Sequence, residues 1–200
     1  MKDLTVIITH YNNIPYILYL ISYFKDKNYD NIEIILIDDA SPQSIFDYTN
    51  SLGCIKYVKN EVNMGIGYVR QQGLDLALGK YITYIDGDDI VTFDFLDTIL
   101  DNIKTNFDVY DFEAINYPLG VKMAASDMVW KKVYKKDFLL KNNCKFKNIR
   151  SGEDIDFYNK LLSHNPQILK VNKIIYLYNL LSNGITHTSF LEEVNERLSA

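Results

Sequence analysis

Carboxylates are concentrated in one short segment of this sequence, Asp86-Gly87-Asp88-Asp89. Three carboxylates within four residues repel one another, and the repulsion is costly directly after an apolar run such as Tyr81–Ile85. A divalent cation would relieve it, and oxygen ligands favour Mg²⁺ or Mn²⁺ over zinc. Gly87 would let a bulky ligand or a diphosphate approach the backbone. The alternative is an acidic turn exposed to water, because Asp-Gly is a common turn pair.

A second acidic segment, Asp38-Asp39-Ala40-Ser41, follows the apolar run Ile32–Ile37. A carboxylate here could recognise a base or a ribose by accepting N–H or O–H hydrogen bonds. It could equally cap the helix that follows. The segment alone leaves both interpretations open.

Two glycines open a predicted helix in the segment Gly65-Ile66-Gly67, with Asn63 before them and Arg70 one turn later. A helix N-terminus of this kind can meet an anion. Arg70 could pair with a phosphate or with one of the clustered aspartates. These two roles for Arg70 are equally compatible with the sequence.

A candidate general base lies at the start of the predicted helix Glu153–Leu162. Its apolar residues are predicted to share one face: Ile155, Phe157, Tyr158, Leu161 and Leu162. Helical spacing points Asp154 into that face, where an unpaired carboxylate is costly. Asp154 could therefore act as a general base, with a pKa raised by burial. The alternative is a capping box with Ser151 as N-cap.

Three further residues are candidates for a site. Trp130 is either a core residue or a platform for an acceptor, and Lys132 is an acceptor-side candidate. His187 lies in a polar loop, as a surface residue or as a third metal ligand, since imidazole suits Mn²⁺. One basic cluster is predicted to be a solvated face: Lys131, Lys132, Lys135 and Lys136.

The elements that must position these residues alternate in the first hundred residues. Strands are predicted at Leu4–Ile8, Ile32–Ile37, Ile55–Val58 and Tyr81–Ile85. Helices are predicted from about Ile14 to Lys27, from Ser41-Pro42 to Leu52 with Gly53 as its stop, from Gly65 to Leu78, and from a Thr92 cap to Thr105. Such alternation is typical of a parallel sheet covered by helices, in which ligands bind beyond the carboxyl ends of the strands.

The second half is less regular. Strands are predicted at Val109–Ala114, Met128–Tyr134 and Ile168–Tyr178, and helices at Phe138–Lys141 and Glu153–Leu162. No repeat or linker is evident, so we expect one α/β domain over residues 1–200. Residues 1–105 would bind the nucleotide and residues 106–190 the acceptor.

Composition narrows the class of protein. The 200 residues are 48% hydrophobic and 24% charged, as expected of a globular domain. The net charge of −5 makes nucleic acid an unlikely partner without excluding a local contact. Cys54 and Cys144 have no metal-binding spacing, and reduced thiols favour a cytoplasmic protein. No signal peptide or transmembrane segment is predicted, although association with a membrane through partners remains open.

Taken in order, these segments resemble family 2 glycosyltransferases of the GT-A fold, a Rossmann-type, mostly parallel sheet flanked by helices. The similar segments are Thr5–Asn12, Asp38–Ser41 (DD-x-S), Asn63–Gly73 (N-x-G-x-x-x-x-R-x-x-G), Asp86–Asp89 (D-x-D-D), Val129–Tyr134 (V-W-x-K-x-Y) and Glu153-Asp154. Each is weak alone, but their order is specific, and they span the chain to about residue 188. His10 and Gln71 depart from the family pattern, which more often has a small residue or Thr and an Asn at these positions.

The resemblance implies an inverting transferase that uses a nucleotide sugar, most often a UDP-sugar, with Mn²⁺ or Mg²⁺. Asp39 would accept the uracil N–H, Asp154 would take the proton of the acceptor hydroxyl, and Glu153 is the alternative base. The donor site would comprise Thr9, Tyr11, Asp38, Asp39, Asn63, Gly65, Arg70, Asp86 and Gly87. The acceptor side would comprise Trp130, Lys132 and Glu153, and the metal site Asp88, Asp89 and His187.

The acceptor is not specified by the sequence: a glycan, a lipid-linked sugar, a protein side chain and a modified base all remain. Two other functions compete. A nucleotidyltransferase would normally carry a glycine-rich loop after the first strand, where this chain has Thr9-His10-Tyr11-Asn12-Asn13. A non-catalytic sugar- or nucleotide-binding protein of the same fold would not need Asp154.

Overall fold

The computed structural model describes residues 2–25, 27, 29–50, 54–123, 127–149 and 151–180. Within them a nine-stranded sheet runs in the order β3-β2-β1-β4-β8-β6-β9-β5, and β7 pairs with β6. The strands are β1 (Leu4–His10), β2 (Ile32–Asp38), β3 (Ile55–Lys59), β4 (Tyr81–Asp86), β5 (Ile90–Val91), β6 (Val109–Tyr117), β7 (Val121–Lys122), β8 (Lys132–Lys135) and β9 (Ile168–Asn179).

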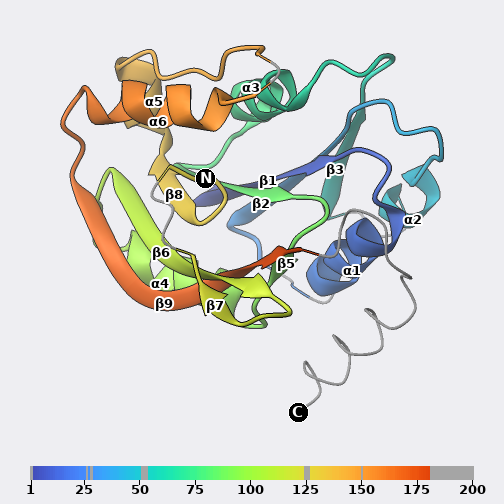
Figure 1. Cartoon of the computed structure of the whole chain (residues 1–200), viewed down its shortest axis with the longest axis horizontal. Coiled ribbons are helices and arrows are strands. Elements are labelled where there is room, and N and C mark those ends of the chain that lie inside the picture. The colour runs from blue at the N-terminus through green and yellow to red at the C-terminus, as the bar shows by residue number, and fades with distance from the viewer. Residues whose placement is uncertain are drawn as a thin grey trace.

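Helices cover both faces of the sheet (Figure 1). They are α1 (Ile14–Lys25), α2 (Phe46–Asn50), α3 (Ile66–Leu76), α4 (Phe95–Ile103), α5 (Lys136–Lys141) and α6 (Glu153–Leu162). One hydrophobic core packs α1 and α4 against the sheet, and a second packs α3, α5 and α6 against the other face. The predicted α/β fold with helices on both faces is therefore confirmed.

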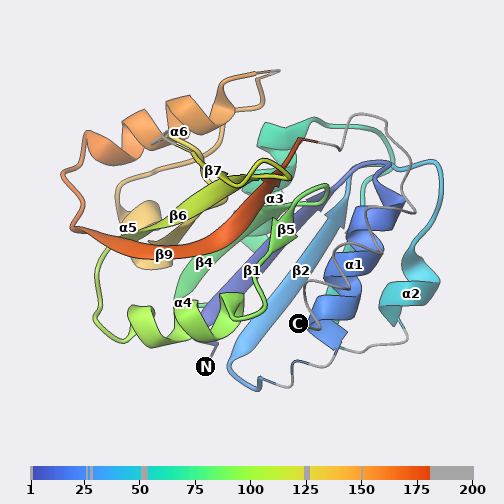
Figure 2. The same ribbon diagram turned by 60° about the horizontal axis from the view of Figure 1, so that its bottom comes forward.

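The first four strands are parallel: β1 pairs with β2 and β4, and β2 pairs with β3. All seven residues of β1 are buried, and burying each large apolar side chain contributes about 1.5–3 kcal/mol. The continuous β-branched run in the sequence reflects this burial on both faces. Beyond β4 the sheet becomes mixed, because β8 is antiparallel to β4 and β6, while β9 is parallel to β6. Figure 2 shows the long strands β6 and β9 curving across this half.

Several predicted boundaries are wrong. No helix starts at Ser41-Pro42, because the Ser41 N–H donates to Asp38 and its hydroxyl accepts the Asn12 N–H, so α2 begins only at Phe46. The predicted end of that helix, residues 52 and 53, lies outside the described residues.

The helix predicted from a Thr92 cap begins at Phe95 with Asp94 as N-cap. The strand predicted at Met128–Tyr134 is confined to β8, which starts at Lys132. The two-residue strands β5 and β7 are too short to give a sequence pattern.

Candidate active site

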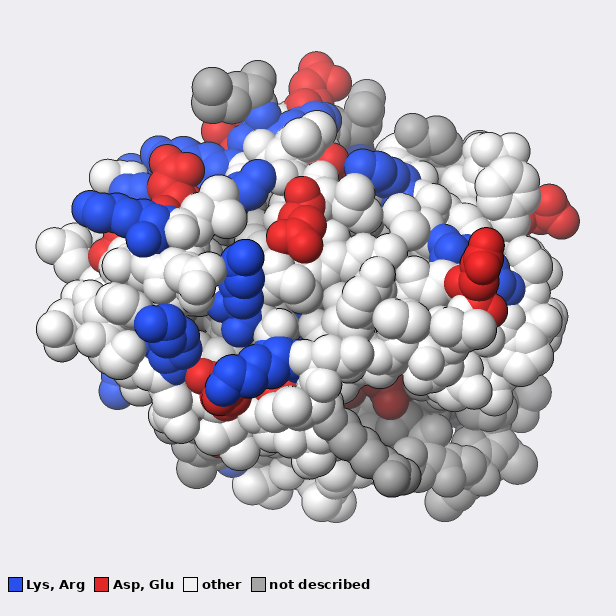
Figure 3. All heavy atoms as spheres, turned by 90° about the horizontal axis from the view of Figure 1, so that it is seen from above, with Lys and Arg blue, Asp and Glu red and all other residues white. Residues whose placement is uncertain are grey.

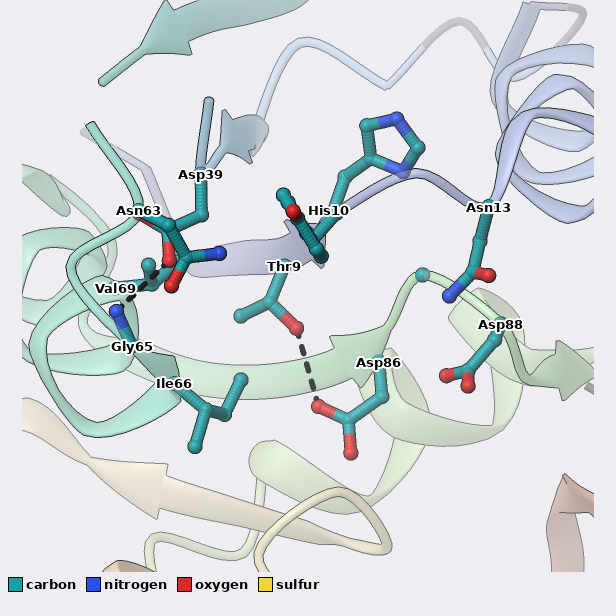
Figure 4. A pocket seen from close by; sticks show the side chains of 12 residues that line it. Thr9, His10, Asn13, Asp39, Asn63, Gly65, Ile66, Val69, Asp86 and Asp88 are labelled. Atoms are coloured by element: carbon teal, nitrogen blue, oxygen red, sulfur yellow. Dashed lines mark hydrogen bonds between the residues drawn. The ribbon is translucent and has the colours of Figure 1, made fainter. Parts of the chain in front are cut away.

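A pocket of about 370 Å³ opens at the carboxyl ends of the parallel strands. The strand register brings these ends together, because Thr9 pairs with Asp86 and His10 with Asp38. Both acidic segments therefore lie at one edge of the sheet, as the sequence predicts. The pocket (Figure 4) is lined by Thr9, His10, Tyr11, Asn13, Asp39, Asn63, Gly65, Ile66, Val69, Asp86, Gly87 and Asp88.

The turn after β4 separates its three carboxylates. Asp86 and Asp88 line the pocket, whereas Asp89 is only 1% exposed and is turned away from it. The Tyr176 hydroxyl donates to Asp89 Oδ2 at 2.7 Å, and the Asn179 backbone N–H donates to Oδ1 at 2.8 Å. Burial, reinforced by the two neighbouring aspartates, raises the pKa of Asp89 well above its usual range. The hydrogen bonds of Asp89 thus hold the turn after β4 against β9.

Gly87 lies in close contact with the end of β1. A Cβ atom at this position would lie 2.4 Å from the Thr9 carbonyl oxygen. The glycine is therefore required for the close approach of the turn to the end of β1. Gly87 also lines the pocket, and the expectation that its small size makes room for a ligand stays a prediction.

Asp38 is completely buried and does not line the pocket. Its Oδ1 accepts the Ser41 N–H and its Oδ2 accepts the Tyr57 hydroxyl, each at 2.7 Å. Burial opposes ionisation of Asp38, but these hydrogen bonds outweigh it and hold the pKa below its ordinary value. The side chain shapes the turn at the end of β2.

Asp39 faces the pocket and fixes the loop that leads into α3. Its Oδ1 accepts hydrogen bonds from the Asn60 amide and the Met64 N–H, and its Oδ2 accepts the Gly65 N–H, all at 2.9 Å (Figure 4 draws the last). Within the described part of the chain Oδ2 accepts one hydrogen bond, so it keeps capacity for a second donor.

Arg70 connects three elements of the site. The residue is 4% exposed. Its Nη2 donates to both oxygens of Asp86 at 2.8 and 2.9 Å, and its Nη1 donates to Glu153. Burial opposes the charge of Arg70, but the two carboxylates outweigh it and raise its pKa. The structure thus selects the ion-pair role for Arg70, which holds Asp86 in place and joins α3 to α6.

Helix α6 is rotated relative to the predicted face. Its buried residues are Glu153, Phe157, Tyr158 and Leu161. Ile155 and Leu162 are 46% and 39% exposed, so their predicted place on the buried face is wrong. The rotation is explained by Glu153, because its ion pair with Arg70 requires that carboxylate to point inward.

Asp154 is half-buried in the first turn of α6, and its Oδ1 accepts the Ile155 N–H at 2.9 Å. The N-cap of this helix is Gly152, with a φ of 80° and no side-chain hydrogen bond, so the capping box with Ser151 does not form. Asp154 lies near enough to Arg70 to help stabilise its charge. Asp154 thus bonds one N–H of the first turn of α6, and its charge lies near Arg70 beside the acidic edge of the pocket.

The acceptor-side candidates Trp130 and Lys132 are both buried, at 2% and 0% exposure, and neither lines the pocket. The Lys132 ammonium donates to the Met128 carbonyl at 2.6 Å and lies 3.7 Å from Asp111. It also lies 4.6 Å from the Tyr158 ring centroid. Burial lowers the pKa of Lys132 to about 8.

The basic cluster at residues 131–136 is not the solvated face that the sequence predicts. Lys131 and Lys132 are buried, and the Lys136 ammonium donates to the Ala77 carbonyl. Figure 3 shows Lys and Arg side chains gathered over the α5–α6 side of the surface. The exposed lysines of α5, α6 and the segment between them are Lys141, Lys145, Lys147 and Lys160.

His187 lies outside the described residues, so its predicted role as a metal ligand stays a prediction. Across the described ranges, no group of three or more His, Cys, Asp or Glu side chains could hold a metal ion. Asp86 and Asp88 are nevertheless two carboxylates on one pocket wall, and Mg²⁺ commonly binds through one or two carboxylates shared with substrate phosphates. No helix of the described part is long and apolar enough to cross a membrane.

Several residues of the site have no clear signal in the sequence. Tyr176 donates to Asp89, and its hydroxyl accepts the Asp86 N–H at 3.0 Å. The Asn179 amide donates to the Asp88 carbonyl at 2.8 Å. Both belong to β9, about ninety residues away in sequence, and only the largely apolar run Ile168–Tyr178 indicates this strand.

His10 is also unforeseen as a pocket residue. It is 2% exposed, and neither ring nitrogen has a hydrogen-bond partner among the described residues. Burial lowers its pKa to about 4, although Asp38 opposes this effect. The imidazole is therefore neutral near pH 7.

This arrangement suits a ligand with a planar base and an anionic end. A half-exposed Tyr11 lines the pocket, as does the Asp39 carboxylate, which lies against the N-terminus of α3. Asp86 and Asp88 line the same pocket, and such carboxylates would hold a divalent cation that binds phosphates.

Comparison with known proteins identifies a family and related structures. The family model described as Glycosyl transferase family 2 matches residues 5–153. Glycosyltransferase GlyG of Streptococcus pneumoniae is 24% identical, over 94% of this chain and 74% of that protein. Cholesterol galactosyltransferase of Borreliella burgdorferi is 28% identical, over 86% of this chain and 58% of that protein.

Among solved structures, S. aureus TarS 1-349 in complex with UDP-GlcNAc superposes with a TM-score of 0.79 at 21% identity. The match covers 94% of this chain and 61% of the TarS chain. At this identity the likeness concerns the fold. The chain thus spans from about three fifths to three quarters of these relatives.

Proposed function

Since the chain belongs to glycosyl transferase family 2 and has the GT-A fold, we propose that it transfers a sugar from a UDP-sugar to an acceptor hydroxyl with inversion. The observation that carries the proposal is the convergence of Asp39, Asp86 and Asp88 on one pocket at the strand ends. The UDP-GlcNAc held by TarS supports the choice of a uridine donor.

The nucleoside would bind between Tyr11 and the Asp39 loop. Asp39 Oδ2, which already accepts the Gly65 N–H, would accept the N–H of the uracil ring. The Tyr11 ring is 50% exposed at the rim and would pack on the base. Thr9 and Asn63, which line the same pocket, would contact the uridine.

The diphosphate would lie against the N-terminus of α3 and the Asp86–Asp88 wall. Asp88 would hold Mg²⁺ or Mn²⁺ together with the phosphates, and Asp86 would support it from its ion pair with Arg70. The cation, when bound, neutralises charge that develops on the departing diphosphate. Asp89 is assigned to the support of the turn, because both of its oxygens accept hydrogen bonds from β9.

Asp154 would act as the general base. The acceptor oxygen forms its bond to the anomeric carbon while the bond from that carbon to the diphosphate oxygen breaks, and the electron pair leaves with the diphosphate. Asp154 takes the hydroxyl proton, and a single displacement inverts the anomeric configuration. Glu153 is the weaker candidate, because its carboxylate already accepts a hydrogen bond from Arg70.

The proposal also includes the class of acceptor and the location of the protein. The acceptor is a hydroxyl of a glycan, a lipid-linked sugar, a protein or a modified base. The net charge of −5 disfavours a long nucleic acid. We also propose that the protein is cytoplasmic, because its two cysteines show no metal-binding pattern. Any association with a membrane would occur through partners.

The decisive experiment measures UDP release and UDP binding with a panel of UDP-sugars, with Mn²⁺, with Mg²⁺ and with a chelator. We expect release that depends on the cation. Asp88→Asn should weaken cation-supported UDP binding. Asp154→Asn should keep UDP binding and lower turnover at least ~10²-fold.

Asp101→Asn, an exposed change on α4, is the control and should behave as the wild type. Absence of both UDP binding and UDP release would overturn the proposal. Binding without release would favour a non-catalytic binding protein, and unchanged turnover of Asp154→Asn would remove Asp154 from the mechanism.

A further inference from the structure

An aromatic stack lies beside the acidic turn, outside the pocket. The Trp130 ring is 4.4 Å from Tyr176 and 5.7 Å from Tyr178, with interplanar angles of 18° and 13°. Exposure rises along this group, from 0% at Tyr176 and 2% at Trp130 to 36% at Tyr178. Tyr178 is therefore the ring through which the stack reaches the surface.

This stack is rigidly joined to the acidic turn. The Tyr176 hydroxyl bonds both the Asp89 carboxylate and the Asp86 N–H, and Asn179, next to Tyr178, donates to the Asp88 carbonyl. Burial raises the pKa of Tyr178, and the charges of Asp89, Asp88 and Asp86 raise it further, so its phenol lies within electrostatic reach of that turn. Tyr178 does not line the pocket assigned to the donor.

The surface around Tyr178 is a row across three strands. Asn116 of β6 pairs with Tyr178 of β9 on one side and with Val121 of β7 on the other, so the three side chains share one face. Val121 is 57% exposed. The row therefore combines a flat aromatic ring, an amide and an apolar side chain.

We propose that Tyr178 is the stacking platform for a pyranose ring of the acceptor. One face of a pyranose is formed by C–H groups, which pack on the electron-rich face of an aromatic ring, while its hydroxyls need polar partners at the edge. Tyr178 offers such a ring, and beside it lies the half-buried Asn116, whose Oδ1 is buried and has no hydrogen-bond partner among the described residues. The inference rests on the proposed function, because a platform next to Asp88 but outside the donor pocket lies on the acceptor side.

Trp130 then has a supporting role. It is buried and cannot itself receive a sugar, but its stacking on both tyrosines fixes the orientation of Tyr178. The acceptor-platform role expected for Trp130 is thus transferred to Tyr178. Tyr178 binds the acceptor without taking part in the bond changes.

Trp130 supplies the probe, because it is the single tryptophan of the chain. With UDP and Mn²⁺ present, methyl β-D-glucopyranoside, methyl β-D-galactopyranoside and the methyl β-glycoside of N-acetylglucosamine are titrated while Trp130 fluorescence is recorded. At least one should give a saturable change. Tyr178→Leu should weaken that binding at least ~10-fold, since the stacking face is lost, whereas Tyr178→Phe should retain it.

UDP binding, followed by calorimetry, should be the same in the wild type and both variants. Tyr48→Leu, which removes another half-exposed tyrosine on α2, is the matched control and should bind both ligands normally. Equal pyranoside affinity of Tyr178→Leu and the wild type would overturn the inference. So would the lack of any saturable response in wild-type protein that binds UDP, a result that holds even if Tyr178→Leu does not fold. Failure to bind UDP at all would instead overturn the proposed function.

Discussion

At the scale of single residues, carboxylates of the same acidic segment have different positions and partners in the structure. Asp86 and Asp88 face the pocket, whereas Asp89 is buried against Tyr176. Likewise Asp39 faces the pocket and Asp38 does not. The difference follows from the chain direction in the two turns and from the partners there, because Asp89 is bonded by Tyr176 and Asn179 of β9, and Asp38 is bonded by Ser41 and Tyr57.

His10 leads to a prediction about pH. Its imidazole has a pKa of about 4 in the folded protein, against an ordinary 6.5, chiefly because it is buried. The unfolded chain therefore takes up a proton before the folded protein does as the pH falls from about 6.5 to 4. Stability contributed by the neutral ring is complete above pH 6.5 and should fall by about 3 kcal/mol across this window.

Urea unfolding at a series of pH values checks this prediction. His10→Asn should remove this part of the slope, while His164→Asn, which deletes an imidazole far from the pocket, should keep it. The groups that face His10 are Asp38, which opposes the shift, and Lys59, which adds to it. Identical slopes for the wild type and His10→Asn would show that His10 is protonated without cost.

At the scale of elements, glycines decide how closely the site elements approach. A Cβ atom at Gly67 of α3 would lie 2.2 Å from the Lys147 carbonyl oxygen. The segment that leads into α6 therefore packs directly on the α3 backbone, and the Arg70–Glu153 ion pair depends on this approach. Gly67 thus has a packing role in addition to any contact of the α3 N-terminus with an anion.

Gly67→Ala should consequently destabilise the protein. The methyl group would gain about 1 kcal/mol of helix propensity, but displacing the Lys147 carbonyl should cost more, leaving a net loss of about 1–3 kcal/mol. Turnover should fall with it, because the start of α6 carries Asp154. Tyr68→Ala, at the neighbouring exposed position, should stay within about 0.5 kcal/mol of the wild type in thermal unfolding. A stabilised Gly67→Ala variant would contradict the packing described here.

At the scale of the whole molecule, the two halves are joined through buried charge and through the sheet. Arg70 and Asp86 belong to the first half, and Glu153 belongs to the second. β8 pairs with β4, and Tyr176 of β9 bonds the turn after β4. The division at about residue 105 is untested as a functional boundary, and the single domain over residues 1–200 stays a prediction.

Glu153→Gln tests this coupling. Removing one partner of a buried ion pair should lower the free energy of unfolding by about 3 kcal/mol. If the chain is one cooperative unit, Trp130 fluorescence, which reports on the second half, and far-ultraviolet circular dichroism should shift together in urea. The control is Asp101→Asn, whose pair with Lys104 is exposed and should contribute less than about 1 kcal/mol. Separate transitions would mean that the halves unfold independently.

The sequence by itself determined the parallel core and the edge at which the site lies. Buried β-branched runs at 4–8, 32–37 and 81–85 alternate with amphipathic helices, and this pattern allows few topologies. Because parallel strands end at one edge, the two acidic segments had to meet there. Eight of the twelve residues that line the pocket are among those predicted, namely Thr9, Tyr11, Asp39, Asn63, Gly65, Asp86, Gly87 and Asp88, whereas His10, Asn13, Ile66 and Val69 are not.

Only the tertiary structure decided the direction and the partners of the side chains. Arg70 pairs with Asp86 and Glu153, and the inward-pointing Glu153 leaves Ile155 on the exposed side of α6. Trp130 and Lys132 are buried, whereas Tyr178 is exposed near the turn that carries Asp88. These side-chain positions depend on contacts between residues that are tens of positions apart in the sequence. The spacing of residues within one segment does not indicate which distant charged group or aromatic ring will contact them.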